Sequence, residues 1–220
     1  MVPLSFAGRD FFVLPSGALF WRAHETLLIA DLHLEKASWF ARFGQMLPPY
    51  DSHATLELVE QDIALSGATR LACLGDSFHD RFGCDRLPDA ARDLLTRLTA
   101  SVDWIWITGN HDVGMIDHCG GRIVEEMELD GVILRHEAVR TEKRPELSGH
   151  FHPKLRLKAR GRRVSRRCFV ASRDKMILPA YGALTGGLDA SHPEIVKAVG
   201  DDAAALVAIS DRVLRFPIAA

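Results

Sequence analysis

Apolar and polar positions alternate along the first half of the chain in a pattern that predicts strands separated by helices. Three apolar runs have the length of buried strands, namely 27–30, 69–74 and 104–107. Between them, residues 51–66 and 88–100 carry apolar side chains at helical spacing. The first half is therefore expected to alternate strand and helix.

The second half changes character and is mostly strand. Strand pairs are expected over 122–136, 154–172 and 204–216, with turns at Asp130-Gly131, at Gly161 and at Ser210-Asp211. Strand–helix alternation followed by a strand-rich half predicts an α/β protein with mixed sheets, organised as one domain over residues 1–220.

Composition excludes several classes of protein. The 220 residues are 47% hydrophobic and 25% charged, with a formal net charge of −2, as in ordinary globular proteins. The four cysteines are widely spaced and predict neither a disulfide framework nor a thiolate zinc site. This cysteine usage predicts a reduced cytoplasmic compartment. The start lacks the basic region and long apolar core of a signal peptide, and no apolar run is long enough to span a bilayer.

Coordinating side chains follow three of the buried runs. The segments read LLIADLH, LACLGDSFHD and WIWITGNHD, and each ends in carboxylate, imidazole or amide groups. Ligands of open α/β sheets bind beyond the carboxyl ends of the strands, so these groups are expected to share one site. They are Asp31, His33, Asp76, His79, Asn110 and His111.

The strand-rich half adds three histidines. His136 ends the run VILRH, and His150 and His152 stand two apart in GHFH, a spacing that places both imidazoles on one side of an extended segment. The candidate ligands are carboxylates, imidazoles and an amide, with no thiolate. This set disfavours a structural zinc site and suits Mn, Fe, Ni or a catalytic Zn centre.

The order of these motifs, DxH, GDxxH, GNHD, H and GHxH over residues 31–152, resembles the calcineurin-like metallophosphoesterase superfamily. The flanking segments LIADLHLEKASWFARFG and LPAYGALTGGLD resemble its bacterial ligase-associated DNA-damage-response (PdeM-type) branch. The resemblance implies a four-layer αββα sandwich of two mixed sheets flanked by helices.

The resemblance also implies a metal centre with seven ligands. Asp76 would bridge two divalent metal ions, Mn first, with Fe, Ni or Zn as alternatives. One ion would take Asp31, His33 and His152, and the other Asn110, His136 and His150. Two such ions activate a water at neutral pH and neutralise phosphate oxygens during attack.

Three further residues receive catalytic roles by the same resemblance. His111 is expected to protonate the leaving oxygen, since an imidazole titrates near pH 7. Asp112 is expected to orient that imidazole through a ring nitrogen, and His79 to contact substrate or transition state.

The segment after the last metal motif is strongly basic. Residues 154–167, KLRLKARGRRVSRR, hold eight Lys or Arg and no acid. The alternation predicts a strand with one basic face and one apolar, buried face. Such a face either holds a phosphodiester backbone or is simply solvated. The residues expected on it are Lys154, Arg156, Lys158 and Arg160.

The helix expected after the first motif carries two open assignments. Lys36 either touches a phosphate or is a solvated lysine. Trp39, Phe40 and Phe43 either line the rim of the cleft or pack that helix against the body, and packing is the favoured interpretation.

The leading functional prediction is a two-metal phosphodiesterase, a DNA endonuclease acting in DNA repair. The alternative is a small-molecule phosphatase or cyclic-nucleotide phosphodiesterase on the same scaffold, and a non-catalytic scaffold ranks third. The family resemblance adds an association with an ATP-dependent DNA ligase, a helicase and an exonuclease. The sequence leaves the oligomeric state open.

Overall fold

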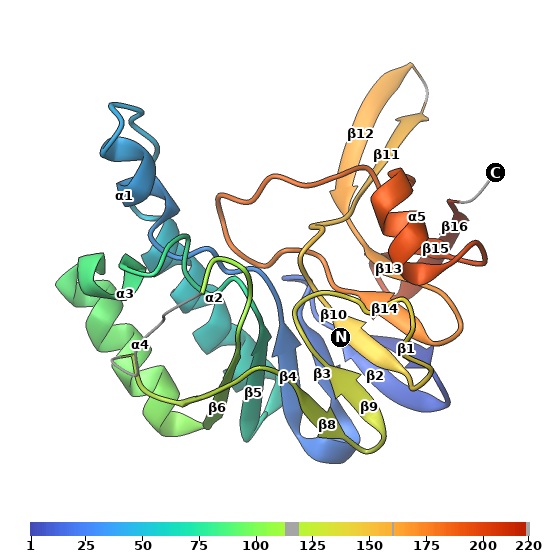
Figure 1. Cartoon of the computed structure of the whole chain (residues 1–220), viewed down its shortest axis with the longest axis horizontal. Coiled ribbons are helices and arrows are strands. Elements are labelled where there is room, and N and C mark those ends of the chain that lie inside the picture. The colour runs from blue at the N-terminus through green and yellow to red at the C-terminus, as the bar shows by residue number, and fades with distance from the viewer. Residues whose placement is uncertain (113–118, 160, 219–220) are drawn as a thin grey trace.

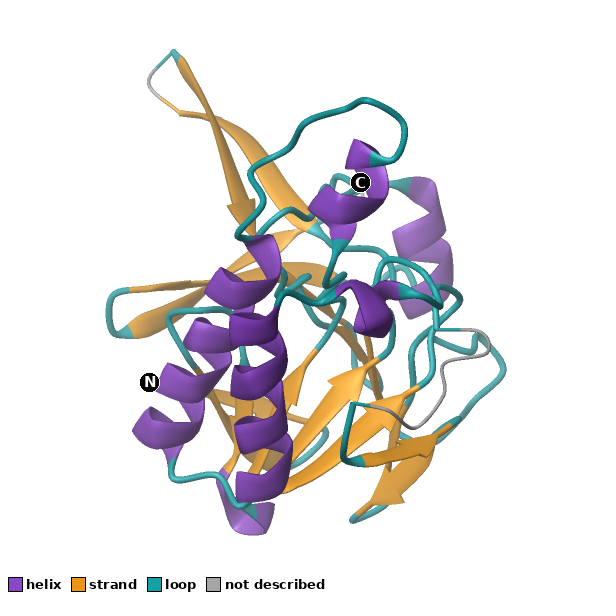
Figure 2. Ribbon diagram, turned by 90° about the vertical axis from the view of Figure 1, so that its left-hand side faces the viewer, coloured by secondary structure: helices purple, strands orange, loops and turns teal. Residues whose placement is uncertain are grey.

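Two stacked β-sheets form the centre of the protein, and helices cover their outer faces (Figures 1 and 2). The computed structural model describes residues 1–112, 119–159 and 161–218. Among these, the strands form two seven-stranded sheets and one two-stranded sheet. The predicted α/β class and the four-layer αββα sandwich are confirmed.

The first sheet contains its strands in chain order, and β4, β5, β6 and β7 run parallel while the others are antiparallel. The strands are β1 (Val2–Phe6), β2 (Arg9–Val13), β3 (Leu19–Trp21), β4 (Thr26–Ile29), β5 (Arg70–Leu74), β6 (Asp103–Ile107) and β7 (Arg122–Val124). A 3-10 helix, η1 (Arg22–His24), joins β3 to β4.

The second sheet is also mixed, with β10 parallel to both of its neighbours. Its order is β16 (Arg212–Pro217), β15 (Ala204–Ile209), β13 (Phe169–Ala171), β14 (Lys175–Ile177), β10 (Glu146–Ser148), β9 (Val132–Leu134) and β8 (Met127–Leu129). The remaining two strands, β11 (Lys154–Ala159) and β12 (Arg162–Arg167), form a hairpin that projects from the body (Figure 1).

The helices lie on the two outer faces. They are α1 (Lys36–Ala41), α2 (Asp51–Ser66), α3 (Gly83–Arg86), α4 (Asp89–Ser101) and α5 (Pro193–Val199). Helices α2 and α4 cover the first sheet and α5 covers the second. In the described part of the chain, no helix combines the length and the apolar character that crossing a membrane requires.

Three apolar clusters hold the layers together, and each lies between two of them. Leu56 and Leu94 pack helices onto the first sheet, and Ile195 packs α5 onto the second. The cluster between the sheets includes Leu28 and Leu147, both fully buried. Burial of apolar area, at about 25 cal/mol per Å², is the dominant stabilising contribution. The cluster between the sheets therefore holds the two sheets packed face to face.

The sequence pattern located most elements, but it joined two segments wrongly. Residues 122–136 were expected to form one strand pair, whereas β7 pairs with β6 in the first sheet and only β8 and β9 form the hairpin at Asp130-Gly131. Parallel pairing of β7 with β6 is a long-range contact that local periodicity does not report.

The cysteines also differ in part from expectation. Cys73 and Cys168 are buried free thiols, whereas Cys84 and Cys119 form a disulfide across 35 residues of sequence. Their Cα atoms lie 6.5 Å apart because α3 packs beside the segment that leads into β7. Proximity of this kind depends on the tertiary fold and leaves no trace in cysteine spacing.

Candidate active site

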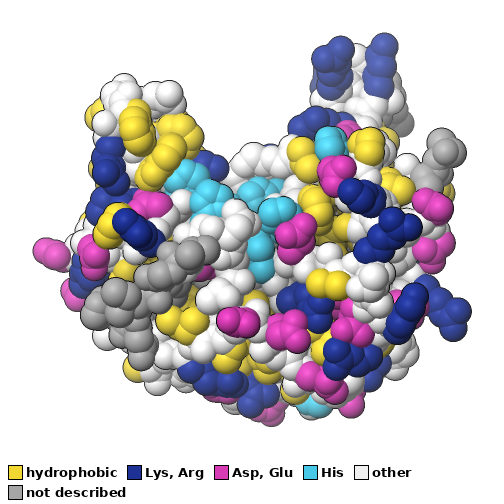
Figure 3. Space-filling model, viewed as in Figure 1, with side chains coloured by type: hydrophobic (Ala, Val, Ile, Leu, Met, Phe, Trp, Pro, Cys, Tyr) yellow, Lys and Arg dark blue, Asp and Glu magenta, His cyan; other side chains and the backbone are white. Residues whose placement is uncertain are grey.

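Five strands from both sheets end at the same edge of the sandwich, and each delivers polar side chains there. In the first sheet, β4, β5 and β6 are parallel neighbours, so their carboxyl ends coincide. In the second sheet, β9 and β10 are parallel and end beside them. The space-filling view shows histidines gathered in the hollow between α1 and the basic hairpin (Figure 3). The predicted convergence of the motifs at one site is therefore present in the fold.

One group of candidate ligands combines two carboxylates and two imidazoles. The ligand atoms of Asp31, His33, Asp76 and His152 all lie within 4.8 Å of one another. His33 Nε2 is 3.7 Å from Asp76 Oδ2, and His152 Nε2 is 3.4 Å from Asp31 Oδ1. Two donor atoms bound to one ion at about 2.1 Å stand roughly 3–3.5 Å apart, so these spacings suit a single cation.

A second group shares Asp76 with the first. Asp76, His136 and His150 again keep their ligand atoms within 4.8 Å of one another. His136 Nε2 lies 3.5 Å from Asp76 Oδ1, whereas His33 faces Oδ2 of the same carboxylate. Asn110 joins this group, with its Oδ1 3.0 Å from His136 Nε2 and 3.1 Å from His150 Nδ1. The two oxygens of Asp76 therefore face two different sets of donors.

The chemistry of the second group fits a bound cation. The Nδ1–H of His136 donates to the carbonyl oxygen of Leu74 at 3.0 Å, which leaves Nε2 with a lone pair. That lone pair faces Asn110 Oδ1, itself an acceptor, at 3.0 Å. Two acceptors repel at this distance unless a cation lies between them. The carbonyl of Leu74 also fixes the imidazole orientation, as partners of metal-binding histidines usually do.

Burial favours the metal-binding form of two candidate ligands, His33 and His150. Desolvation, followed by repulsion from neighbouring histidines, lowers the pKa of His33 to about 2. Burial also lowers the pKa of His150, again with repulsion from His136. Neutral imidazole is the form that coordinates metal ions.

The backbone of the site is strained at its ligands. Five of the seven, Asp31, His33, Asp76, His150 and His152, have φ between 45° and 73°, which non-glycine residues rarely adopt. Such strain collects at functional sites, where the surrounding fold holds it in place. Gly109 does not have a positive φ. It is required because a Cβ at this position would overlap the backbone nitrogen of Asp76.

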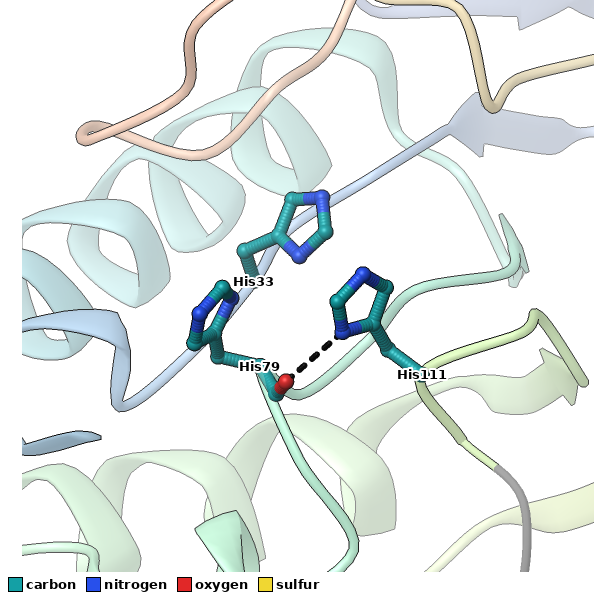
Figure 4. A group of neighbouring side chains, drawn as sticks. All are labelled: His33, His79 and His111. Carbon is teal, nitrogen blue, oxygen red and sulfur yellow. Dashed lines mark hydrogen bonds between the residues drawn. The ribbon is translucent and has the colours of Figure 1, made fainter. Parts of the chain in front are cut away.

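His111 and His79 lie together beside the first group (Figure 4). His111 Nδ1 donates to the carbonyl oxygen of His79 at 2.8 Å, and its Nε2 lies 3.9 Å from Asp76 Oδ2. The two rings stack with centroids 5.2 Å apart, and burial lowers the pKa of His79 to about 4. His111 therefore presents Nε2 toward the candidate metal ligands.

The expectation that Asp112 orients His111 is wrong. The Asp112 carboxylate is buried and accepts hydrogen bonds from the backbone N–H groups of Ser77, Phe78 and Gly109. It therefore ties the turn after β6 to the turn after β5. The carbonyl of His79 holds the His111 ring instead, a contact that sequence order does not predict.

The basic hairpin lies beside this site, and its two faces differ. Cross-strand pairs place Lys154 opposite Arg167, Arg156 opposite Ser165 and Lys158 opposite Arg163, so these side chains share one face. Lys154 Nζ donates to the Thr185 carbonyl and Arg156 to the Gly187 carbonyl.

This basic face lies on the side of the metal ligands. The segment that receives those bonds is joined to the site, because Gly182 N donates to the Asp31 carbonyl. Desolvation lowers the pKa of Lys154, with added repulsion from Arg167, Arg156 and Lys36.

One expectation for the hairpin is only partly met. The apolar face was expected to be buried, yet only its root is, since Leu155 is buried and Leu157 is 39% exposed. A hairpin that projects from the body has no layer to cover its outer half. The basic face was expected to include Arg160, which lies outside the described residues.

Lys36 stands at the start of α1. Desolvation lowers its pKa, while the nearby Asp51 carboxylate opposes the shift. Its charge acts on both His33 and His79, which places the ammonium group close to the site.

The aromatic residues of α1 do not pack the helix down, so the favoured interpretation was wrong. Ala37 is the buried residue of α1, whereas Trp39 and Phe40 are half-buried and Phe43, just beyond the helix, is 64% exposed. Trp39 and Phe40 instead line an open pocket of about 790 Å³ together with His79, His111 and Asn110. Arg42, Arg81 and Phe82 also line this pocket, and no sequence motif marks any of them.

Comparison with known proteins identifies the class of this fold and site. Residues 24–166 match the family model of the calcineurin-like phosphoesterases, so the chain belongs to that family. Together with the His and Asp clusters, this makes the chain a metal-dependent phosphoester hydrolase. A comparison with curated proteins finds no match.

The comparison with solved structures gives a more specific similarity than the family model. The chain is similar to the nuclease MPE of Pseudomonas putida, with 29% identity, a TM-score of 0.75, and coverage of 97% of this chain and 98% of that one. This similarity is consistent with the ligase-associated branch. The phosphoesterase Yfce of E. coli matches at 16% identity and a TM-score of 0.42, over 74% of this chain and 83% of its own.

Proposed function

We propose that the chain is a two-metal phosphodiesterase that cuts nucleic acid. The observation that carries the proposal is the sharing of Asp76 between two groups of ligands, with one carboxylate oxygen facing each. The first metal would be held by Asp31, His33, Asp76 and His152, and the second by Asp76, Asn110, His136 and His150. Manganese is the proposed metal, with Fe, Ni or Zn as alternatives.

The bound metals would supply a nucleophile at neutral pH and offset the charge on the phosphate oxygens. The remaining work falls to this chain's own residues. His111 presents Nε2 toward the ligands while the His79 carbonyl fixes its ring, so a protonated His111 is placed to donate to the leaving oxygen. Asp112 keeps the turns that carry Asp76 and Asn110 together.

Two observations favour nucleic acid over a small substrate. The P. putida nuclease, which covers nearly the whole chain, supports a polynucleotide substrate. The basic face of the hairpin, with Lys154, Arg156 and Lys158, begins beside the metal ligands and suits a phosphodiester backbone. Action in cytoplasmic DNA repair, beside an ATP-dependent ligase, a helicase and an exonuclease, belongs to the same proposal and rests on family resemblance.

The testing experiment compares four substrates. Metal-free protein is reloaded with Mn²⁺ and given a DNA oligonucleotide, bis-nitrophenyl phosphate, nitrophenyl phosphate and a cyclic nucleotide. Cleavage of the oligonucleotide and of the simple diester is expected. Activity on the monoester alone would establish a phosphatase, and activity on the cyclic nucleotide alone a cyclic-nucleotide phosphodiesterase.

The variant Asp76→Asn shows whether the measured hydrolysis comes from this site or from a contaminating enzyme. Asp76→Asn should lose activity on every substrate that the unaltered protein hydrolyses. If the reloaded protein binds metal but hydrolyses none of the four, the proposal is wrong and a binding role replaces it.

A further inference from the structure

We propose that the aromatic pocket beside His111 binds a nucleobase next to the scissile phosphate, an inference that rests on the proposed function. The pocket is formed by α1 with the residues after it and by the segments after β5 and β6. Its walls are Trp39, Phe40, Arg42, His79, Asp80, Arg81, Phe82, Asn110 and His111.

The pocket offers flat aromatic faces that the core does not use. Phe82, in the pocket wall, is 48% exposed. Phe43 lies just beyond α1 and outside the wall, is 64% exposed and packs its ring against Trp39. Trp39 and Phe40 contact each other and the His79 ring, with centroid distances of 4.9 Å from Trp39 to His79 and 5.8 Å from Phe40 to His79. Exposed aromatic side chains grouped at a cleft are costly to keep in water and indicate a binding surface.

Ring stacking connects this surface to the reaction centre. Phe40 stacks on His79 with an interplanar angle of 23°, and His79 stacks on His111 with an angle of 21°. His111 is the residue proposed to protonate the leaving oxygen. A nucleoside attached to that oxygen would therefore extend from His111 into the pocket.

The charge around the pocket suits a nucleotide rather than an apolar ligand. Arg42 and Arg81 are exposed at its wall, and the Arg81 guanidinium lies over the Phe82 ring, 4.6 Å from its centroid. Across the hollow stands the hairpin, with Lys and Arg side chains at its surface (Figure 3). One wall thus presents aromatic rings for bases and the other presents cations for phosphates, the combination by which proteins hold unstacked nucleic acid.

The pocket is also held in shape. Arg86 forms an ion pair with Asp80, and the same guanidinium donates to Ser38 on α1. The Asp80 carboxylate also accepts from the Phe82 backbone N–H. These bonds lock the segment after β5 against α1, so the two aromatic walls keep a fixed separation.

The test uses a DNA strand in which one nucleotide at a time is replaced by an abasic residue. With Mn²⁺-loaded protein, an abasic residue on the leaving-group side of a bond should lower kcat/KM for that bond by about 5- to 150-fold, the range expected for loss of one stacked base. The same replacement several nucleotides away should change little. If every position gives the same kcat/KM, the subsite does not exist.

Variants attribute the effect to the pocket. Phe82→Ala should lower kcat/KM on intact DNA and abolish the difference between intact and abasic strands, whereas Phe82→Trp should keep it. Leu65→Ala, which truncates an equally exposed side chain outside the pocket, should behave as the unaltered protein. If Phe82→Ala lowers cleavage of intact and abasic strands equally, the pocket does not recognise the base.

The experiment distinguishes failure of the nucleobase subsite from failure of the proposed function. Protein that cuts no DNA at all overturns the proposed function. Protein that cuts DNA but ignores the missing base overturns the subsite alone.

Discussion

The Nε2 atoms of His33 and His152 lie 3.2 Å apart, although 119 residues separate the two histidines. His33 follows β4 of the first sheet and His152 follows β10 of the second. A cation between them would therefore link the two sheets directly. Metal binding is expected to stabilise the packing of the sandwich as well as to enable catalysis.

The first prediction concerns Asp76 and this link. Asp76→Asn should weaken metal binding in both groups, since each uses one oxygen of the same carboxylate. Titration calorimetry should show the loss of both binding events, and Mn²⁺ should no longer raise the melting temperature. In the unaltered protein, metal at 100 times its Kd should add about 2.7 kcal/mol to the free energy of unfolding.

Asp103→Asn provides the matched control, because Asp103 lies at the opposite end of the same sheet and pairs with Arg70 and Arg122. It should keep both metals. If Asp76→Asn kept two metals and full activity, the two-metal interpretation would be wrong.

The second prediction concerns His111. His111→Ala should leave metal content near normal and lower turnover by about 10²- to 10⁴-fold on a substrate with a poor leaving group, because the proton donor is removed. With a nitrophenolate leaving group, which needs no proton, the decrease should be much smaller. Equal decreases on both substrates in a steady-state assay would exclude the role of general acid.

The ligand positions could be predicted from the sequence because each depends on a local pattern. A short apolar run followed by Gly-Asp or Gly-Asn marks a strand end, and the edge rule for parallel strands brings Asp76 and Asn110 together. The family resemblance then divided the ligands between two metals, and the distances around Asp76 are compatible with that division.

The pocket and the role of Asp112 could not be predicted, since they depend on which segments meet in three dimensions. Whether Phe40 is buried is decided by how α1 sits on the body, not by the helical spacing of its side chains. Asp112 follows His111 directly in sequence, yet its carboxylate turns to backbone N–H groups from the β5 turn. Neither the exposure of Phe40 nor the contacts of Asp112 can be predicted from a pattern in one amino-acid sequence.

The third prediction concerns pH and Asp62, which lies on α2 away from the metal ligands. Burial raises the pKa of Asp62 above its ordinary 3.8, although Ser16 and Tyr181 both donate to its Oδ2. A carboxyl with a raised folded-state pKa contributes stability below its unfolded pKa and loses that contribution as pH rises through the folded value. Asp62→Asn should therefore become less destabilising relative to the unaltered protein as pH rises above about 3.8.

Urea unfolding of metal-free protein across this pH range measures the effect, and Asp103→Asn should show the opposite trend. A hydrogen bond from Arg70 and one from Arg122, opposed by burial, lower the pKa of Asp103, so its contribution is present at higher pH and disappears on acidification. Parallel profiles for the two variants would contradict the assigned pKa directions.

The last prediction tests whether the basic hairpin holds a polynucleotide backbone. Arg156 and Lys158 lie on the face that adjoins the metal site, whereas Arg162 and Arg166 lie on the other face of the same hairpin. Replacing Arg156 and Lys158 with Gln should weaken DNA binding and reduce the slope of log K against log salt by about 0.7–0.9 for each phosphate that the variant no longer neutralises. Hydrolysis of bis-nitrophenyl phosphate should barely change, because the metal ligands and His111 are untouched.

The double variant Arg162→Gln with Arg166→Gln removes the same charge from the opposite face. Fluorescence anisotropy over a range of salt concentrations should show a smaller effect on affinity and on slope for this pair. If both pairs act equally, the hairpin attracts DNA only through its net charge. If neither changes affinity or slope, the basic face is merely solvated, and the nuclease proposal then depends on similarity to the P. putida enzyme alone. The geometry favours the first pair, because among the described residues of the hairpin that face is the one joined through residues 182–187 to the strand end that carries Asp31.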